Sequence, residues 1–172
     1  DQKLDLNNNV LRGIYSFGFE KPSSIQKKAL YPMTKNIHNG RRRDITAQAQ
    51  SGTGKTGAFV IGSLNILKKD VKGPQVLILA PTHELADQTL NVVENLSRYI
   101  KDVNPTLLVG GTSVDKNKKI LNTKHPKIVV GTPGRVNDLI RRKFLKTDSL
   151  SLLILDEADE MLNMGFKEEI DA

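Results

Sequence analysis

The chain has 172 residues, of which 26 are Lys or Arg and 19 are Asp or Glu, so its formal net charge is +7. It contains no cysteine, which excludes disulfides, thiolate catalysis and cysteine-bound zinc. No apolar run approaches the length of a membrane span. The composition predicts one basic globular domain that favours polyanionic partners and binds no membrane. We expect a cytoplasmic location, with the nucleus as the alternative.

Short apolar runs predict buried strands at residues 44–48, 76–80, 106–110, 127–131 and 151–156, of which the first is the weakest. Helical periodicity fills residues 54–69 and 82–100. The charged stretch 115–119 is expected to be a turn or the start of a helix. Strands that alternate with helices predict an α/β fold, with a parallel sheet and helices on both faces. Ligands bind such sheets where strands end, so the loops after the strands hold the candidate functional residues.

The first such loop reads "AQAQSGTGKT" at residues 47–56. It follows a predicted strand and opens a predicted helix, as a phosphate-binding loop does. Its backbone N–H groups would hold phosphates, Lys55 would reach the terminal phosphates, and the Thr56 hydroxyl would bind Mg²⁺. The general pattern begins with glycine where this chain has Ala49, so the loop alone leaves a plain glycine-rich turn open.

The last loop reads "DEAD" at residues 156–159, directly after the last apolar run. One carboxylate there can hold Mg²⁺ through water, and a second can orient or deprotonate an attacking water. These roles fall to Asp156 and Glu157. Acidic residues also favour a helix N-terminus, which is the alternative interpretation. A phosphate loop and a strand-end acidic pair in one α/β chain favour a nucleotide-hydrolysing site.

At this point the chain resembles the DEAD-box ATP-dependent RNA helicases, over nearly its whole length. The resemblance is carried by six motifs in the family's order: "GFEKPSSIQ" at 18–26 (Q motif), "AQAQSGTGKT" (motif I), "PTHELA" at 81–86 (motif Ia), "GG" at 110–111, "TPGR" at 132–135 (motif Ib) and "DEAD" (motif II). Alanine at the start of motif I is usual in this family, which answers the question raised by Ala49. Within the family, the translation initiation factor 4A group looks most similar.

The resemblance implies a RecA-like P-loop domain, the first of two, that occupies residues 1–172. The second RecA-like domain and motif III would lie outside this chain. It also implies an enzyme that couples binding and hydrolysis of ATP, with Mg²⁺, to RNA binding and local duplex unwinding in translation initiation. The isolated chain is expected to be inactive, because the second domain supplies the arginine finger. The expected partners are RNA, held by its backbone, that second domain, and translation-factor or RNA-complex proteins.

The resemblance also assigns the site residues. Gln26 would read adenine and Phe19 would pack near the base. The phosphate loop comprises Gln50, Ser51, Gly52, Thr53, Gly54, Lys55 and Thr56. The catalytic residues are Lys55, Asp156 and Glu157, and Mg²⁺ is held by Thr56 and Asp156, largely through water. The RNA-backbone residues are Pro81, Thr82, His83, Gly111, Thr132, Gly134 and Arg135, and Asp159 would link this domain to motif III.

One departure and two alternatives matter for the function. His83 stands where the family usually has arginine, which affects one expected RNA or inter-motif contact. An ATP-gated RNA clamp, or an mRNA-export type of DEAD-box protein with little unwinding role, would carry the same motifs. A P-loop ATPase acting on DNA is the other alternative, and Gln26 together with the "DEAD" spelling argues against it.

Overall fold

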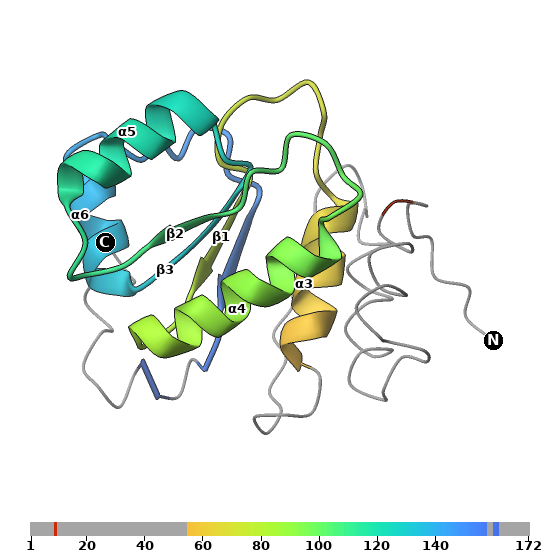
Figure 1. Cartoon of the computed structure of the whole chain (residues 1–172), viewed down its shortest axis with the longest axis horizontal. Helices are drawn as coiled ribbons and strands as arrows, with labels where there is room; N and C mark the ends of the chain where they lie inside the picture. The colour runs from red at the N-terminus through yellow and green to blue at the C-terminus, as the bar shows by residue number, and fades with distance from the viewer. Residues whose placement is uncertain (1–8, 10–54, 158–159, 162–172) are drawn as a thin grey trace, which may run out of the picture. The chain divides into compact units, whose positions relative to one another are not determined.

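The computed structural model describes Asn9, residues 55–157 and residues 160–161 (Figure 1). The chain divides into two compact units. The first unit contains the described residues up to Leu67 together with Val92–Lys101. The second unit contains Lys68–Asn91 and the described residues from Asp102 onward. The predicted strand at 44–48 lies outside the described residues.

The second unit contains a parallel sheet of four strands in the order β2-β3-β1-β4. The strands are β1 (Val76–Leu79), β2 (Thr106–Leu108), β3 (Ile128–Gly131) and β4 (Leu152–Leu155). Every residue of β1 and β3 is buried, as expected for strands covered on both faces. The four apolar runs between residues 76 and 156 therefore form the predicted parallel sheet, and each observed strand is slightly shorter than its run.

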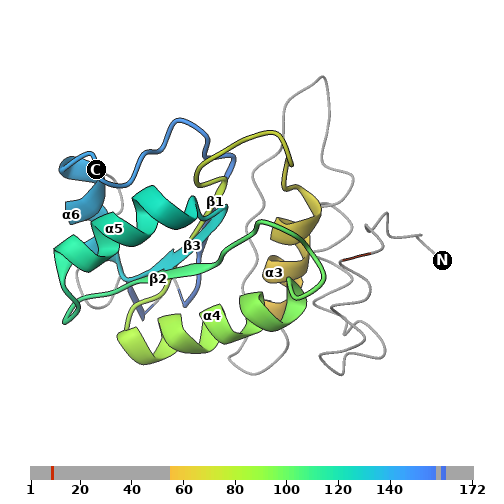
Figure 2. The same ribbon diagram turned by 45° about the horizontal axis from the view of Figure 1, so that its top comes forward.

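Three helices begin shortly after strands end, namely α4 (His83–Leu96), α5 (Val114–Lys124) and α6 (Pro133–Arg141). Figures 1 and 2 show α5 and α6 on the same side of the sheet. Leu121 of α5 and Leu139 of α6 join Leu77, Leu108 and Val129 of the strands in one buried apolar cluster. This cluster fixes the two helices on the sheet, and with them the loops that precede each helix.

The structure adds a helix that periodicity did not predict. Residues 132–135 were assigned to an RNA-binding motif with no predicted helix, whereas α6 begins inside them with Thr132 as its N-cap. Pro133 suits the first helical position, where a missing N–H costs no hydrogen bond. The charged stretch 115–119 lies within α5 and is indeed the start of a helix, capped by the Ser113 side chain.

The first unit contains α3 (Lys55–Asn65) and the last residues of α4. The periodicity predicted a helix over 54–69, but α3 ends earlier. Its end tightens, because Ile66 N donates to Ser63 O at 3.3 Å and Leu67 N donates to Leu64 O at 3.4 Å. The residues that follow α3 from position 68 to position 70 are exposed and charged. Among the residues with a described placement, no helix has the length and apolar character needed to cross a membrane.

Candidate functional site at the carboxyl edge of the sheet

The four loops that follow the strands of the second unit lie at one edge of the sheet, because parallel strands end on the same side. Backbone hydrogen bonds tie them together. Thr132 N donates to Leu108 O at 3.2 Å, which joins the loop after β3 to the end of β2. Asp156 N donates to Leu79 O at 2.8 Å, which joins the loop after β4 to the end of β1. We call this row of loops the carboxyl edge.

Gly131, the last residue of β3, allows two of these loops to approach closely. A Cβ atom at this position would lie 2.4 Å from Leu108 O and 2.5 Å from Val136 Cγ2. Both distances are far below van der Waals contact, so the backbone leaves no room for a side chain. Gly134, in the same stretch, was predicted as a site residue, whereas Gly131 was not. Gly134 lies on α6 and is exposed.

Three helices direct their N-termini to the carboxyl edge. Thr82 Oγ1 accepts a hydrogen bond from Leu85 N at 3.2 Å and so caps α4. Ser113 caps α5 in the same way through Lys116 N. Thr132 precedes α6, but its hydroxyl makes no capping bond. The first N–H groups of a helix have no partner within the helix, so an anion can be held at each of these three ends.

The loop after β2 contains the predicted Gly110–Gly111 pair. Gly111 has φ +81, a left-handed conformation that residues with a Cβ rarely adopt. The Thr112 hydroxyl donates to Val109 O at 2.8 Å and closes this turn. Gly110 and Gly111 are both exposed. The turn therefore presents backbone to solvent beside the N-terminus of α5, as a surface that holds phosphates requires.

Asp156 is the buried carboxylate of the carboxyl edge, with 6% of its surface exposed. The Thr89 hydroxyl, from α4, lies 3.1 Å from its Oδ2 and can donate to it. The same hydroxyl lies 3.0 Å from Leu85 O, and its single hydrogen serves one acceptor at a time. Thr89 lies within the predicted helix 82–100, and the motifs assign it no role. A polar residue among apolar ones was the signal that could have revealed it.

Glu157 follows Asp156 with φ 53, in the left-handed region. This conformation is uncommon for a residue other than glycine and occurs often at functional sites. Glu157 O accepts a hydrogen bond from Met161 N at 3.2 Å. The turn gives the two adjacent carboxylates different surroundings, because Asp156 is buried whereas Glu157 is half-buried.

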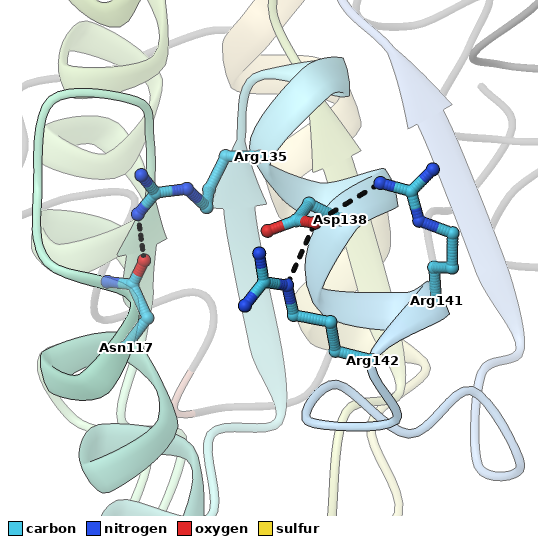
Figure 3. Close-up of polar contacts among 5 residues, drawn as sticks. All are labelled: Asn117, Arg135, Asp138, Arg141 and Arg142. Carbon is cyan, nitrogen blue, oxygen red and sulfur yellow. Dashed lines mark hydrogen bonds and ion pairs between the residues drawn. The ribbon is translucent and has the colours of Figure 1, made fainter.

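Arg135, on the first turn of α6, is held against the loop after β2 (Figure 3). Its Nη1 donates to Thr112 O and to Asn117 Oδ1, both at 2.8 Å. One turn further along α6, Asp138 accepts from Arg142 Nε at 3.0 Å and from Arg141 Nη2 at 3.3 Å. The hydrogen bond from Arg142, joined by the bond from Arg141 and the charges of both, lowers the pKa of Asp138 below its ordinary value.

The structure brings the predicted RNA-backbone residues and Asp156 and Glu157 to the carboxyl edge of the second unit. His83 is the first residue of α4 and is exposed. Lys55 and Thr56 begin α3 in the first unit, so their pairing with Asp156 would join two units and stays a prediction. The remaining predicted site residues lie outside the described residues: Phe19, Gln26, Gln50, Ser51, Gly52, Thr53, Gly54 and Asp159.

Within the described residues, no group of three or more acidic, histidine or cysteine side chains could hold a metal by itself. Asp156 still fits the predicted Mg²⁺. This ion prefers oxygen ligands, keeps several waters and is usually bound by one or two carboxylates together with substrate phosphates. A single buried carboxylate at a strand end matches that ligand set.

Comparisons with known proteins agree with this geometry. A family model described as DEAD/DEAH box helicase matches residues 23–172. The chain is 49% identical over 167 residues to the ATP-dependent RNA helicase eIF4A of Aspergillus fumigatus, covering 97% of this chain and 39% of that protein. It is 50% identical to eIF4A of Botryotinia fuckeliana, covering 97% and 40%. The chain thus spans about two fifths of the length of these curated relatives.

Solved structures give the same picture. A DEAD box protein from the hyperthermophile Methanococcus jannaschii superimposes with a TM-score of 0.87 at 38% identity, over 98% of this chain and 44% of that chain. Saccharomyces cerevisiae Dbp5 bound to RNA and ADP BeF3 superimposes with a TM-score of 0.84 at 40% identity, over 97% and 40%. These likenesses confirm the predicted RecA-like α/β fold.

Proposed function

This chain belongs to the DEAD/DEAH box helicase family, and we propose that it is the first RecA-like domain of an ATP-dependent RNA helicase of the initiation factor 4A type. The complete protein would bind and hydrolyse ATP in step with RNA binding and local duplex unwinding. A second RecA-like domain, outside this chain, would complete the site. Support comes from the names and identities of the curated relatives, and from a carboxyl edge suited to phosphates.

The observation that carries the proposal is the row of three helix N-termini beside Asp156 on one sheet edge. RNA backbone phosphates need hydrogen-bond donors and positive potential, and base edges need not be read. The N-termini of α4, α5 and α6, the exposed Gly110–Gly111 turn and the guanidinium of Arg135 supply both. We propose that one RNA strand follows these loops by its backbone.

The ATP half of the proposal rests on Lys55, Thr56, Asp156 and Glu157. Lys55 would clamp the terminal phosphates, and Asp156 would hold Mg²⁺, which neutralises charge that develops on the transferring phosphoryl group. Glu157 would orient or deprotonate the attacking water. The different surroundings of the two carboxylates suit this division of roles, because Asp156 is buried beside Thr89 whereas Glu157 is more exposed.

A second candidate is an mRNA-export type of DEAD-box protein with little unwinding role. The observation that favours it is the structural likeness to Saccharomyces cerevisiae Dbp5, which has been solved with RNA and also with Nup159 and Gle1. Identity to Dbp5 is 38–40%, against 48–50% for the eIF4A relatives. The sequence comparison therefore favours the initiation factor 4A type.

Calorimetry and a turnover assay on the 172-residue chain test the proposal. We expect the chain to bind ADP at least as tightly as ATP, and Lys55→Ala to weaken binding sharply while the circular dichroism spectrum is kept. We expect no RNA-stimulated hydrolysis without the second domain. If the unmodified chain binds no nucleotide, the assignment of the ATP site is wrong. RNA-stimulated turnover by this chain alone would contradict the two-domain mechanism.

A further inference from the structure

Arg135 is anchored through only one of its terminal nitrogens. Nη1 donates to Thr112 O and Asn117 Oδ1 at 2.8 Å and also lies 3.2 Å from Thr112 Oγ1. In the part of the chain that the structure describes, Nη2 and Nε of Arg135 donate to no residue. A guanidinium group has five N–H donors in a planar fork, so three of them stay available to an anion.

The anchor of Arg135 is electrically neutral. Its three acceptors are uncharged oxygens, namely a backbone carbonyl, a hydroxyl and a side-chain amide oxygen. Arg135 makes no ion pair among the described residues. Arg141 and Arg142 differ, because both pair with the Asp138 carboxylate, 3.3 and 3.0 Å away. Figure 3 shows the two arrangements next to each other on α6. Arg135 therefore keeps its positive charge for a ligand, whereas Arg141 and Arg142 share a counter-ion.

Asn117 is the buried member of this anchor. It lies on α5 with 3% of its surface exposed, although its neighbours Lys116 and Lys118 are exposed. Its amide oxygen faces Arg135, which comes from a different helix. An aspartate at this position would have nearly the same shape and the same acceptor geometry, but it would add the negative charge that the anchor lacks. The choice between these two residue types thus sets the charge of the site without changing its shape.

The charge distribution along the chain adds to this argument. Residues 113–148, which include α5, β3 and α6, contain ten of the 26 basic residues and three of the 19 acidic ones. This segment therefore carries the whole formal net charge of +7. Because its anchor is neutral, Arg135 keeps its positive charge where this segment reaches the carboxyl edge.

We propose that Asn117 is a positioning residue for RNA binding, which fixes the Arg135 guanidinium beside Thr112 without neutralising its charge. This inference rests on the proposed function, since the ligand of Arg135 is the RNA backbone. Asn117 touches no RNA itself in this account. It acts on RNA affinity through Arg135 alone.

The test measures binding of fluorescein-labelled oligouridylate to the chain by anisotropy over a series of KCl concentrations. Asn117→Asp keeps the hydrogen bond and adds a counter-ion, so we expect affinity to fall about 3- to 10-fold. The slope of log affinity against log salt should become shallower by about 0.7, the value for one phosphate contact with a single strand. The midpoint of thermal unfolding should stay unchanged or rise.

Asn122→Asp is the matched control, because it makes the same change of charge on an exposed residue of the same helix. We expect it to leave the affinity and the salt slope nearly unchanged. Asn117→Ala removes the anchor but stays neutral, so the affinity should fall several-fold while the salt slope is kept. In an Arg135→Ala background, Asn117→Asp should have little further effect, as a double-mutant cycle would show.

The outcomes separate the inference from the function on which it rests. If the unmodified chain does not bind oligouridylate, the proposed RNA-binding function fails. If it binds, but Asn117→Asp and Asn122→Asp reduce affinity equally, or Asn117→Asp acts as strongly without Arg135, Asn117 is not a positioning residue. If Asn117→Asp does not fold, the Asn117→Ala variant decides, and unchanged affinity in that variant overturns the inference.

Discussion

The two edges of the sheet in the second unit differ in a way that bears on function. The carboxyl edge has helix N-termini, exposed glycines and the buried Asp156. The amino edge has a cleft of about 260 Å³ formed by the segments that precede β1, β3 and β4 and by the last turns of α5. Its lining is Lys72, Gly73, Pro74, Leu121, Asn122, His125, Pro126, Phe144, Leu145, Lys146, Asp148 and Ser149.

The cleft at the amino edge is a hollow, but the proposed phosphate-binding groups lie at the other edge. Proline, leucine and phenylalanine side chains line much of the cleft, and Lys118 Nζ sits 4.7 Å from the centre of the Phe144 ring. Phosphates instead require backbone N–H groups at helix N-termini, and in this sheet those lie at the carboxyl edge. The hydrogen-bond donors at the carboxyl edge therefore fit the proposed function better than the cleft does.

The largest expected effect is on ATP turnover, which should fall when Glu157 at the carboxyl edge is replaced by glutamine but not when a residue at the amino edge is replaced. In the full-length protein, we expect ATP turnover to fall at least about 100-fold, because the amide cannot take a proton from water. Lys146→Ala, in the cleft at the amino edge, should keep normal turnover. Phosphate release at saturating ATP and RNA measures both. Near-normal turnover in Glu157→Gln would show that Glu157 is not the general base.

Gly131→Ala should destabilise the chain by about 1–3 kcal/mol, because its Cβ would overlap the Leu108 carbonyl oxygen. Gly110→Ala is the control, since nothing lies within 4 Å of a Cβ there and its stability should change by less than about 0.5 kcal/mol. Urea denaturation followed by circular dichroism compares the two. Equal stabilities would mean that the strand ends at the carboxyl edge are less tightly packed than the structure shows.

The sequence predicted the sheet well because its strands are apolar runs bounded by polar loops. The strand predicted at 106–110 is too long at its C-terminal end. The chain leaves the sheet after Leu108, and Gly111 adopts a left-handed conformation. Helix α6 was missed because the stretch is only nine residues long, although Val136 and Leu139 lie three positions apart on a buried face and Pro133 marks the first turn.

The site was predictable where a motif lies in one loop, and less so where a contact joins distant segments. Residues 156–157 were assigned from their place after a strand, and residues 81–83 and 132–135 from the family motifs that they resemble. Asn117 lies in the charged stretch "DKNKK", which resembles any solvated helix start, and only the folded structure shows that it meets Arg135, 18 positions away. Thr89 and Asp156 are 67 positions apart and meet for the same reason.

Thr89→Val should have a smaller effect than Gly131→Ala. The variant keeps the shape of the side chain but removes the hydroxyl that faces Asp156, and such a bond contributes about 1 kcal/mol. We expect a comparable loss in the free energy of unfolding at neutral pH. Thr123→Val, on the exposed side of α5, is the control and should change stability less. Equal effects would show that the bond to Asp156 contributes nothing specific.

His83→Arg should give the smallest change. Arginine brings a permanent positive charge and a planar fork of N–H donors that matches a phosphate, so RNA affinity at neutral pH should rise a few-fold. Filter binding of single-stranded RNA by the full-length protein measures it. His125→Arg, at the amino edge, is the matched control and should change affinity less, because it lies away from the proposed RNA path. An equal gain would indicate a general effect of charge.

The most direct test of the central claim is a map of RNA contacts on the second unit. Amide resonances of the 172-residue chain can be followed by NMR while single-stranded RNA is added. We predict that the shifts concentrate at residues 81–83, 109–113 and 132–135, along the carboxyl edge. Shifts that concentrate instead at residues 72–74, 125–126 and 144–149 would place the RNA on the cleft at the amino edge and contradict the account.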